Sequence, residues 1–318
     1  MPSYLVTGGA GFIGSNLCHA LAARGDRVRA VDNLVTGKEE NLAGLDGVEF
    51  LFGDICDPGV AARAMRGVDY VLHQAAIPSV PRSVEDPMGT SRNNVMGTIS
   101  CLEAARKEGV KRLVLASSSS IYGEVEPGLA KTETMLPAPL SPYAAAKIAC
   151  EYYLRVFFTT YGFECVALRY FNVFGPRQDP TSRYSAVVPN FIAAALDGQT
   201  ATIYGDGHQS RDFCYVGNVV EANLLACTAP GAAGKVMNVA CGESTSLLQM
   251  AAEIGRIVGR PLALAHAPER LGEVKHSLAD VSLARRILGR VGEVKFAAGI
   301  EETIAWYRRA RTDQARRA

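Results

Sequence analysis

A tyrosine and a lysine four residues apart are the first sign of chemistry in this sequence. In the run Ser141-Pro142-Tyr143-Ala144-Ala145-Ala146-Lys147, serine is a typical helix N-cap and proline a typical first helical residue. The spacing then places Tyr143 and Lys147 on one face of the helix. A nearby ammonium favours the phenolate of a tyrosine, whose reference pKa of about 10 otherwise makes it a poor base. The pair can therefore act as a general base, although such pairs also occur by chance on solvated helices.

A run of serines supplies a second reactive element. Residues 116–123 read Ala-Ser-Ser-Ser-Ser-Ile-Tyr-Gly and follow a predicted strand. Ligands of open α/β sheets bind at the carboxyl ends of the strands. One serine at that place can hold a reacting hydroxyl and pass its proton to the tyrosine, whereas the others cap a turn. Together the two motifs predict proton transfer to and from a substrate hydroxyl.

A glycine-rich loop after the first predicted strand indicates a dinucleotide site. Residues 7–14 read Thr-Gly-Gly-Ala-Gly-Phe-Ile-Gly, with Gly8, Gly11 and Gly14 three apart and Phe12 and Ile13 between the last two. Glycines permit the tight turn and let backbone N–H groups approach a pyrophosphate at a helix N-terminus. The position of the loop between a strand and a helix makes the motif specific.

An acidic residue at the end of the second predicted strand favours NAD over NADP. Asp32 is placed to accept hydrogen bonds from the adenosine ribose and to repel a 2′-phosphate. Asn33 follows it, and no arginine does, so we expect NAD. Lys38 is the residue that would make this prediction wrong.

The third predicted strand ends in a second acid. Asp54, followed by Ile55, is placed to receive the adenine amine. Alternatively, Asp54 caps the helix predicted to begin at Pro58. The sequence leaves both interpretations open.

The elements that must position these residues alternate as βαβ units do. Most of the predicted strands are continuous apolar runs, which is typical of strands covered on both faces. They are Tyr4–Thr7, Arg27–Asp32, Val48–Gly53, Tyr70–Ala75, Arg112–Ser117 and Cys165–Arg169. We therefore predict an α/β fold with a Rossmann-type doubly wound parallel sheet.

The pattern changes after Tyr170 to a Gly/Pro/Ser-rich stretch. It is followed by a predicted helix, two short strands and a strand that rejoins the sheet, at Val187–Leu196, Thr202–Tyr204, Asp212–Val216 and Val236–Ala240. We predict an NAD-binding Rossmann domain over residues 1–171 with return segments at about 212–240. A smaller, discontinuous α/β substrate-binding lobe is predicted over residues 172–211 and 241–318.

Composition excludes several other classes of protein. The chain has 318 residues, 48% of them apolar, so it can bury a full-sized core. A net charge of +1 provides no broad field for nucleic acid or an acidic membrane. None of the eight cysteines forms a C-x-x-C pair, which predicts reduced thiols and no metal site. No apolar run reaches the roughly 18 residues of a membrane span, and the first strand leaves no room for a signal peptide, so we expect a cytoplasmic protein.

The sequence strongly resembles the extended short-chain dehydrogenase/reductases, and within them the UDP-sugar 4-epimerases, over nearly its whole length. The matching stretches are TGGAGFIG, SSSSIYG, SPYAAAK, RYFNVFGPRQ and SRDFCYV. The resemblance implies NAD as cofactor, a UDP-sugar as substrate, and Ser118, Tyr143 and Lys147 as catalytic residues. It also implies a homodimer formed through helices at 93–106 and 143–161. Similar dehydratases carry an acidic pair where Ser119 and Ser120 stand, which disfavours elimination of water.

The same resemblance implies further site residues. For the cofactor they are Ala75, Ala76, Asn94 and Phe171, and for the substrate Ser118, Ser119, Asn172, Val187, Tyr204, Arg211, Arg270, Glu273 and Ser277. Arg211 and Arg270 match the diphosphate-binding arginines, since guanidinium directs two donors toward phosphate oxygens. A structural pair between Arg211 and Asp212 is the alternative. Tyr204 stands where an aromatic ring stacks on uracil, and Glu273 replaces the more usual aspartate as ribose contact.

Ser277 stands where the family varies between large and small side chains beside the C2 substituent of the sugar. Its small size predicts C4 epimerisation of UDP-GlcNAc and UDP-GalNAc as well as UDP-glucose and UDP-galactose, through a 4-keto intermediate. Two other functions remain open. Arg177 and Arg183 would bind the carboxylate of a UDP-uronic acid in an epimerase or decarboxylase. The same fold also serves non-catalytic NAD-binding regulators.

Overall fold

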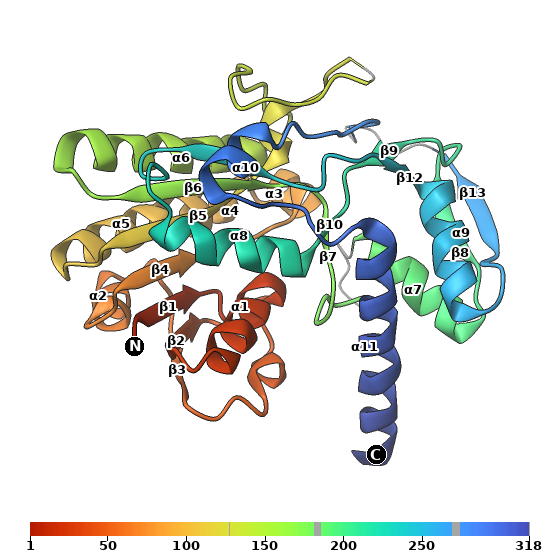
Figure 1. The fold of residues 1–318 in the computed structure, drawn as a ribbon, viewed down its shortest axis with the longest axis horizontal. Coiled ribbons are helices and arrows are strands. Elements are labelled where there is room, and N and C mark those ends of the chain that lie inside the picture. The colour runs from red at the N-terminus through yellow and green to blue at the C-terminus, as the bar shows by residue number, and fades with distance from the viewer. Residues whose placement is uncertain (127, 181–185, 269–273, 318) are drawn as a thin grey trace.

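A seven-stranded, wholly parallel sheet forms the centre of the protein (Figure 1). The computed structural model describes residues 1–126, 128–180, 186–268 and 274–317. The strand order is β11-β6-β5-β4-β1-β2-β3, so the chain changes direction across the sheet between β1 and β4. The strands are β1 (Ser3–Thr7), β2 (Arg27–Asp32), β3 (Val48–Phe52), β4 (Tyr70–His73), β5 (Arg112–Ser118), β6 (Cys165–Tyr170) and β11 (Val236–Val239). This confirms the predicted Rossmann-type sheet, including the returning strand.

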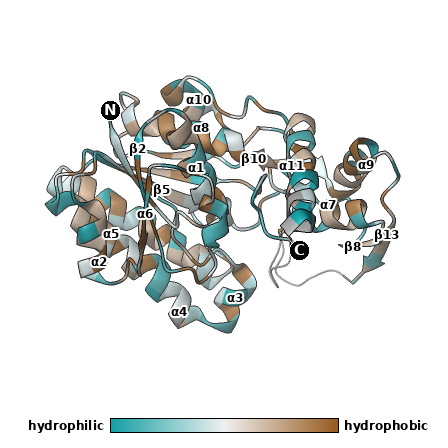
Figure 2. Ribbon diagram, turned by 90° about the horizontal axis from the view of Figure 1, so that it is seen from below, coloured by the Kyte–Doolittle hydropathy of each residue, from teal (hydrophilic) through white to brown (hydrophobic). Residues whose placement is uncertain are grey.

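Helices cover both faces of the sheet. Successive side chains of a strand face opposite ways, so Tyr4 and Val6 of β1 enter one apolar cluster and Leu5 the other. The first cluster includes α1 (Phe12–Ala23) and α8 (Val216–Thr228), and the second α2 (Pro58–Met65), α5 (Gly97–Lys107) and α6 (Pro142–Tyr161). In Figure 2 the flanking helices carry both brown and teal segments, as helices with one apolar and one polar face do.

Short elements link the strands to the helices. They are the 3₁₀ turns η1 (Glu39–Leu42) and η3 (Ser119–Tyr122), the helices α3 (Val80–Glu85) and α4 (Pro87–Ser91), and the π-helical turn η2 (Arg92–Met96). Single π turns inside helices occur often at functional sites. All of these links except η1 precede α5 or α6.

A third apolar cluster, made of helices and small sheets, lies to one side of the main sheet (Figure 1). It is built around α7 (Val187–Asp197), α9 (Leu247–Val258), α11 (Phe296–Arg317), β8 (Ala201–Tyr204) and β13 (Leu264–Ala267). Two-residue strands complete it, β7 (Val173–Phe174) with β10 (Cys214–Tyr215) and β9 (Ser210–Arg211) with β12 (Thr245–Ser246). The helix α10 (Ser282–Leu288) packs on α8 and β11 instead. Part of the segment predicted for the lobe therefore lies against the main sheet.

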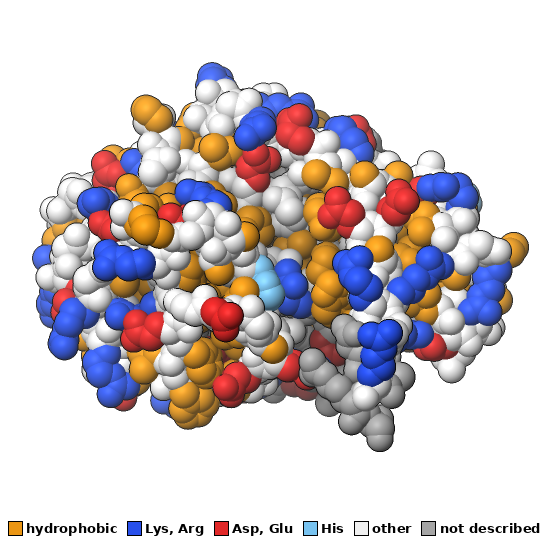
Figure 3. Space-filling model, turned by 60° about the horizontal axis from the view of Figure 1, so that its bottom comes forward, with side chains coloured by type: hydrophobic (Ala, Val, Ile, Leu, Met, Phe, Trp, Pro, Cys, Tyr) orange, Lys and Arg blue, Asp and Glu red, His pale blue; other side chains and the backbone are white. Residues whose placement is uncertain are grey.

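The surface carries no large field of one sign on the face in view. Lys and Arg are interspersed there with Asp and Glu (Figure 3). Within the described part of the chain, no helix is both long and apolar enough to cross a membrane. All eight cysteines are free thiols, seven of them buried.

Candidate active site

The glycine-rich loop closes tightly between β1 and α1. Gly8 has a φ of +66° and donates its N–H to the Val31 carbonyl oxygen at 2.8 Å. A Cβ on Gly14 would lie 2.0 Å from the Gly8 oxygen, and one on Gly8 would lie 2.8 Å from the Ala75 Cα. Gly11 caps α1 without a side-chain hydrogen bond. The backbone thus forms a cradle with a helix N-terminus at its rim, which fits the pyrophosphate of a dinucleotide; the predicted residues Phe12 and Ile13 form the first turn of that helix.

Asp32 is held beside this cradle by backbone amides. Its Oδ2 accepts a hydrogen bond from the Ala10 N–H at 3.0 Å and its Oδ1 accepts one from the Leu34 N–H at 2.8 Å. Burial raises the pKa of the carboxyl, and these amide donors oppose the rise. Asn33 accepts the Val35 N–H at 3.2 Å. The carboxylate therefore has a fixed orientation at the end of β2, where a ribose is expected.

The structure removes one of the two interpretations of Asp54. Asp57 caps α2, because its side chain accepts the N–H groups of Gly59 and Val60 at 2.7 and 3.4 Å. Asp54 accepts the Cys56 N–H at 2.9 Å and does not cap the helix. The helix-cap alternative is wrong, and the adenine contact of Asp54, with buried Ile55 beside it, stays a prediction.

A buried relay of hydrogen bonds links the end of β1 to the segments around Ala75 and Asn94, both predicted to face the cofactor. The Thr98 hydroxyl donates to the Asn94 carbonyl at 2.6 Å, so its oxygen accepts from His73 Nε2 at 3.0 Å. The opposite nitrogen, Nδ1, then accepts from the Thr7 hydroxyl at 2.7 Å. Thr7 in turn accepts the Ala75 N–H at 3.2 Å. The relay fixes His73 as the neutral Nε2–H tautomer.

Burial and the charge of Lys147 lower the pKa of His73 to about 3, which agrees with a neutral ring. Asn94 also clamps Ile77, accepting its N–H at 2.8 Å and donating to its carbonyl at 3.3 Å. Ala75 and Ala76 lie half-buried beside this clamp. Sequence reasoning missed His73, although a polar residue at the end of β4 is the signal that would have found it.

The tyrosine, lysine and serine of the predicted chemistry lie at neighbouring element ends. Ser141 caps α6 by accepting the Ala144 N–H at 3.2 Å. Lys147 is buried, lies 5.9 Å from the centre of the half-exposed Tyr143 ring, and donates to the Ala116 carbonyl of β5 at 2.8 Å. This bond attaches α6 to β5 two residues before Ser118.

Ser118 ends β5 and opens the turn η3. Its Oγ accepts from the Ser120 N–H at 3.2 Å and from the Ser120 hydroxyl at 2.9 Å. Ser118 and Ser119 are both half-buried. The Ser118 hydroxyl therefore keeps its own hydrogen for another acceptor.

A buried ion pair contacts the strand end before the turn η3 and the last residue of that turn. Arg169 donates to both carboxylate oxygens of Glu151 at 2.9 and 2.7 Å, and both side chains are about 5% exposed or less. Glu151 also accepts from the Ser117 hydroxyl, and Arg169 donates to the Tyr122 hydroxyl at 2.8 Å. Sequence reasoning missed this pair, since Glu151 belongs to no motif and Arg169 was noted only as the first residue of the RYFNVFGPRQ stretch.

The residues predicted for the substrate lie just after β6, at the start of α7, at the end of β8 and in β9. Asn172 has a φ of +31°, rare for a residue other than glycine, and its side chain donates to the Asp212 carbonyl at 3.4 Å. Arg211 donates to the carbonyl oxygens of Ser210 and Lys275 at 3.0 and 2.7 Å. Tyr204, at the end of β8, is 36% exposed, and Val187 is the half-buried first residue of α7.

Asp212 is fully buried and joins three separate segments. Its carboxylate accepts the N–H groups of Cys241, Gly242 and Ala279 at 2.9, 3.0 and 3.2 Å. Burial raises its pKa to about 6 against these donors. The sequence suggested Asp212 only as a partner of Arg211 and gave no sign that it binds the backbone of distant segments.

Two predicted residues make contacts that the sequence did not indicate, and three lie outside the described residues. Phe171, predicted beside the nicotinamide, is fully buried against Tyr122, with ring centres 6.1 Å apart. Arg177, a predicted carboxylate ligand, has a φ of +68° and donates to Asn16 of α1 at 2.5 Å, a contact that does not support that role. The residues outside the described ranges are Arg183, Arg270 and Glu273.

Residues 4–240 match the model of the NAD dependent epimerase/dehydratase family. The chain belongs to this family. It is 40% identical over 309 residues to the UDP-glucose 4-epimerase of Mycolicibacterium smegmatis, covering 96% of this chain and 98% of that one. The UDP-N-acetylglucosamine 4-epimerase of Methanobrevibacter ruminantium, solved with UDP-N-acetylmuramic acid, superposes with a TM-score of 0.92 at 40% identity over 97% and 99% of the chains. The NAD complex of Thermus thermophilus UDP-glucose 4-epimerase gives 0.89 at 40% over 96% and 99%.

This member of the epimerase/dehydratase family is an NAD-dependent enzyme of the isomerase class. The cradle around Gly8 and the orientation of Asp32 fit that cofactor for the reasons given above. In the family model the matched residues include every segment of the relay and of the Tyr143 and Lys147 helix.

A buried lysine that sequence reasoning missed links the end of the Ser118 turn to the segment around Ala279. Lys131 is 2% exposed, donates its Nζ–H to the Gly123 carbonyl at 2.9 Å, and forms a bridge with Ala279. Burial and the charge of Arg211 lower its pKa to about 8. No motif surrounds Lys131, so nothing in the sequence could have marked it.

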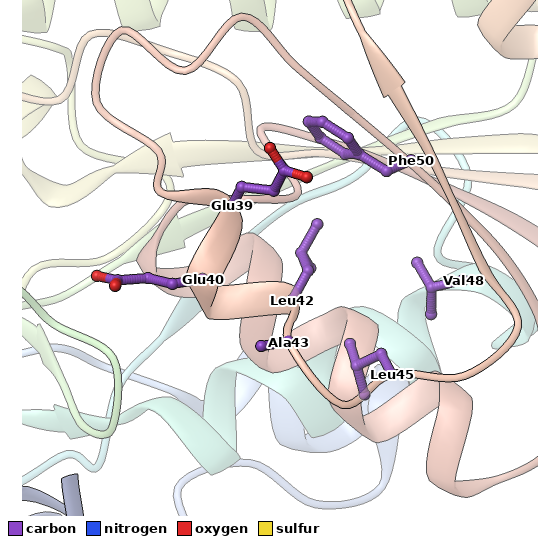
Figure 4. Close-up of a pocket in the computed structure, with 7 residues that line it drawn as sticks. All are labelled: Glu39, Glu40, Leu42, Ala43, Leu45, Val48 and Phe50. Atoms are coloured by element: carbon purple, nitrogen blue, oxygen red, sulfur yellow. The ribbon is translucent and has the colours of Figure 1, made fainter. Parts of the chain in front are cut away.

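A hollow of about 450 Å³ lies away from all these residues, beside the edge strand β3. Leu42, Leu45, Val48 and Phe50 line it, and Glu40 points away from Phe50 (Figure 4). It contains none of the predicted site residues. The candidate site is therefore defined by converging side chains rather than by the size of a cavity.

Proposed function

We propose that this enzyme interconverts the C4 epimers of a UDP-hexose. The observation that carries the proposal is the meeting of Tyr143, Lys147 and the Ser118 turn at the carboxyl end of β5, in the same sheet as the dinucleotide cradle. That edge is where ligands of doubly wound sheets bind. The 4-epimerases among the similar proteins support the same activity.

In the proposed reaction Tyr143 removes the proton of the sugar 4-hydroxyl through Ser118. Lys147, whose buried amine lies 5.9 Å from the centre of the Tyr143 ring, is the residue proposed to assist this step. NAD, held by the glycine-rich loop and Asp32, would supply a reversible acceptor for the C4 hydride of the sugar. The 4-keto sugar must turn within the site between the two transfers, and Tyr143 then gives its proton back. No net oxidation results, so the cofactor must stay bound throughout.

Other residues would hold the nucleotide while the sugar turns. Arg211 and Arg270 are proposed to bind the diphosphate, because guanidinium groups direct paired donors to phosphate oxygens. Tyr204 would stack on uracil and Glu273 would bind the ribose. Asn172, Val187 and Ser119 would line the sugar site, where the unusual backbone of Asn172 places its amide next to Asp212.

We further propose that N-acetylated sugars are accepted beside the plain hexoses. Ser277 donates its N–H to the Ser210 carbonyl at 3.1 Å and lines a cavity of about 90 Å³ together with Ser210 and His276. A bulky side chain at position 277 would fill this space. Ser277→Tyr should lower kcat/KM for UDP-GlcNAc by about 100-fold while UDP-glucose loses less than threefold, because about 3 kcal/mol is typical of forcing extra atoms into a packed site. Equal losses on both sugars would contradict this role.

The decisive experiment is to incubate the purified protein with four UDP-sugars and separate the products by chromatography. Conversion of UDP-GlcNAc to UDP-GalNAc and of UDP-glucose to UDP-galactose is expected. UDP-glucuronate is assayed beside them. Exclusive conversion of UDP-glucuronate would replace the proposed substrate with a uronate, and tight NAD binding without any conversion would indicate a regulator.

We propose that two copies of the chain associate through α5 and α6. The resemblance implies this arrangement, and α6 carries apolar side chains that are exposed in the single chain. Tyr152, Tyr153, Val156 and Tyr161 are 56%, 40%, 47% and 54% exposed. Light scattering should give twice the 33.9 kDa chain mass for the wild type. Val156→Glu should give one chain mass, because it places a charge inside the apolar contact.

A further inference from the structure

Lys38 lies next to the carboxylate expected to bind the adenosine ribose. Its backbone N–H donates to the Ala10 carbonyl at 2.9 Å, and the Ala10 N–H donates to Asp32 at 3.0 Å. Gly37 touches the same carboxylate, since a Cβ there would lie 2.7 Å from Asp32 Oδ2. Dinucleotide enzymes that accept a 2′-phosphate place a cation near this point. Lys38 therefore stands where NADP would be recognised.

The ammonium of Lys38 is engaged by a carboxylate from a distant part of the chain. Lys38 Nζ lies 2.8 Å from Asp179, in the loop between β7 and α7, and 4.0 Å from Glu40. The Lys38 side chain is 47% exposed and Asp179 is 32% exposed, so the pair is at the protein surface without being fully solvated. Lys38 is the cation on the loop between β2 and η1, close to Asp32. Asp179 thus determines the direction in which the Lys38 ammonium points.

The loop that carries Asp179 is anchored on α1. Asn16 of α1 donates to the Pro176 carbonyl at 3.0 Å and accepts from Arg177 at 2.5 Å. Gln178 donates to the Val173 carbonyl at 3.2 Å, and its own carbonyl accepts from the Tyr307 hydroxyl. Contacts with α1, β7 and α11 therefore hold the backbone of residues 176–178, just before Asp179.

We propose that Asp179 is a cofactor-specificity residue, which excludes NADP by engaging Lys38. A 2′-phosphate would have to displace the Asp179 carboxylate from Lys38 and would meet the negative charges of Asp32 and Asp179. NAD has no phosphate at that position and needs neither the cation nor the displacement. Selection of the cofactor is in this way shared between the β2 end and a loop beyond β7.

The test is the ratio of NADH to NADPH affinity, measured by fluorescence titration of the full-length protein. Asp179→Asn keeps the size of the side chain and should shift this ratio about fivefold toward NADPH, since surface charge pairs contribute up to about 1 kcal/mol. In Asp179→Asn/Lys38→Gln the shift should disappear, because the freed ammonium is what would bind the phosphate. Glu40→Gln is the matched control at 4.0 Å from the same amine and should change the ratio less than twofold.

An unchanged ratio in Asp179→Asn would overturn the proposal. A shift that persists after Lys38→Gln would overturn the part assigned to Lys38, and an equal shift in Glu40→Gln would overturn the assignment to Asp179. Partial loss of folding affects both nucleotides alike and cancels in the ratio. The readout involves no sugar nucleotide, so it stands apart from the proposed epimerisation.

Discussion

Two buried carboxylates, one at each side of the site, differ in how far along the chain their partners lie. Asp32, on the cofactor side, accepts N–H groups from Ala10 and Leu34, which belong to the same βαβ unit. Asp212, on the substrate side, accepts N–H groups 29, 30 and 67 residues further along the chain. Asp32 can therefore be oriented by a local unit, whereas Asp212 needs three distant segments to be assembled. Substitutions on each side should then affect one ligand and spare the other.

The largest effect is expected where the two sides meet, at Tyr143. Tyr143→Phe removes the hydroxyl that would carry the proton, so kcat should fall about 1000-fold, within the range typical of general acid–base groups. NADH and UDP-sugar affinities should change less than threefold, since the ring remains. Tyr152→Phe, an exposed tyrosine on the same helix, is the matched control. Activity near that of the wild type in Tyr143→Phe would remove the tyrosine from its proposed role.

His73 tests the cofactor side through the pH dependence of stability. Its folded pKa of about 3 lies below the unfolded value of 6.5, so the unfolded chain binds the extra proton between these values. Stability from this group is therefore complete above pH 6.5 and is lost as the pH falls toward 3, at a cost of about 2 kcal/mol between pH 7 and pH 5.

In His73→Asn this part of the pH dependence should be absent from urea unfolding curves. NADH affinity should also fall, because the relay to Ala75 and Asn94 is interrupted. His208→Asn, on an exposed turn, should keep the wild-type pH dependence. A loss of UDP-sugar affinity as large as the loss of NADH affinity would break the division between the two sides.

Asp212 gives the smallest expected effect, on the substrate side. Asp212→Asn keeps the shape but replaces one carboxylate oxygen by a donor, which weakens the bonds to the backbone amides. We expect KM for the UDP-sugar to rise about tenfold and NADH affinity to stay within twofold. Asp197→Asn, in an exposed pair with Arg311, should leave both constants unchanged. A comparable loss of NADH affinity would show that the two sides are not independent.

The sequence predicted the local features of the molecule better than the distant ones. All six strands predicted in the first half are present with ends within two residues, because alternation of apolar runs and glycine-rich turns is a local property. The cap at Ser141 and the spacing of Tyr143 and Lys147 were readable for the same reason. The placement of Arg177 on α1 was not, since it depends on a positive φ and a partner 161 residues away.

Buried polar groups without motifs were also beyond prediction. Lys131 and Glu151 each stand alone in the sequence, and only the folded chain shows what they bond. Their partners come from other strands or helices. When no motif surrounds a polar residue in the sequence, its burial cannot be inferred until the topology is known.

The place of β11 has a consequence for synthesis of the protein. This strand pairs with β6, yet 65 residues separate Tyr170 from Val236. On a ribosome adding roughly 5–20 residues per second, β6 waits several seconds with its outer N–H and C=O groups unpaired. An unpaired strand edge invites association with other nascent chains. The interval before β11 emerges is therefore when this protein is most exposed to aggregation and most in need of chaperones.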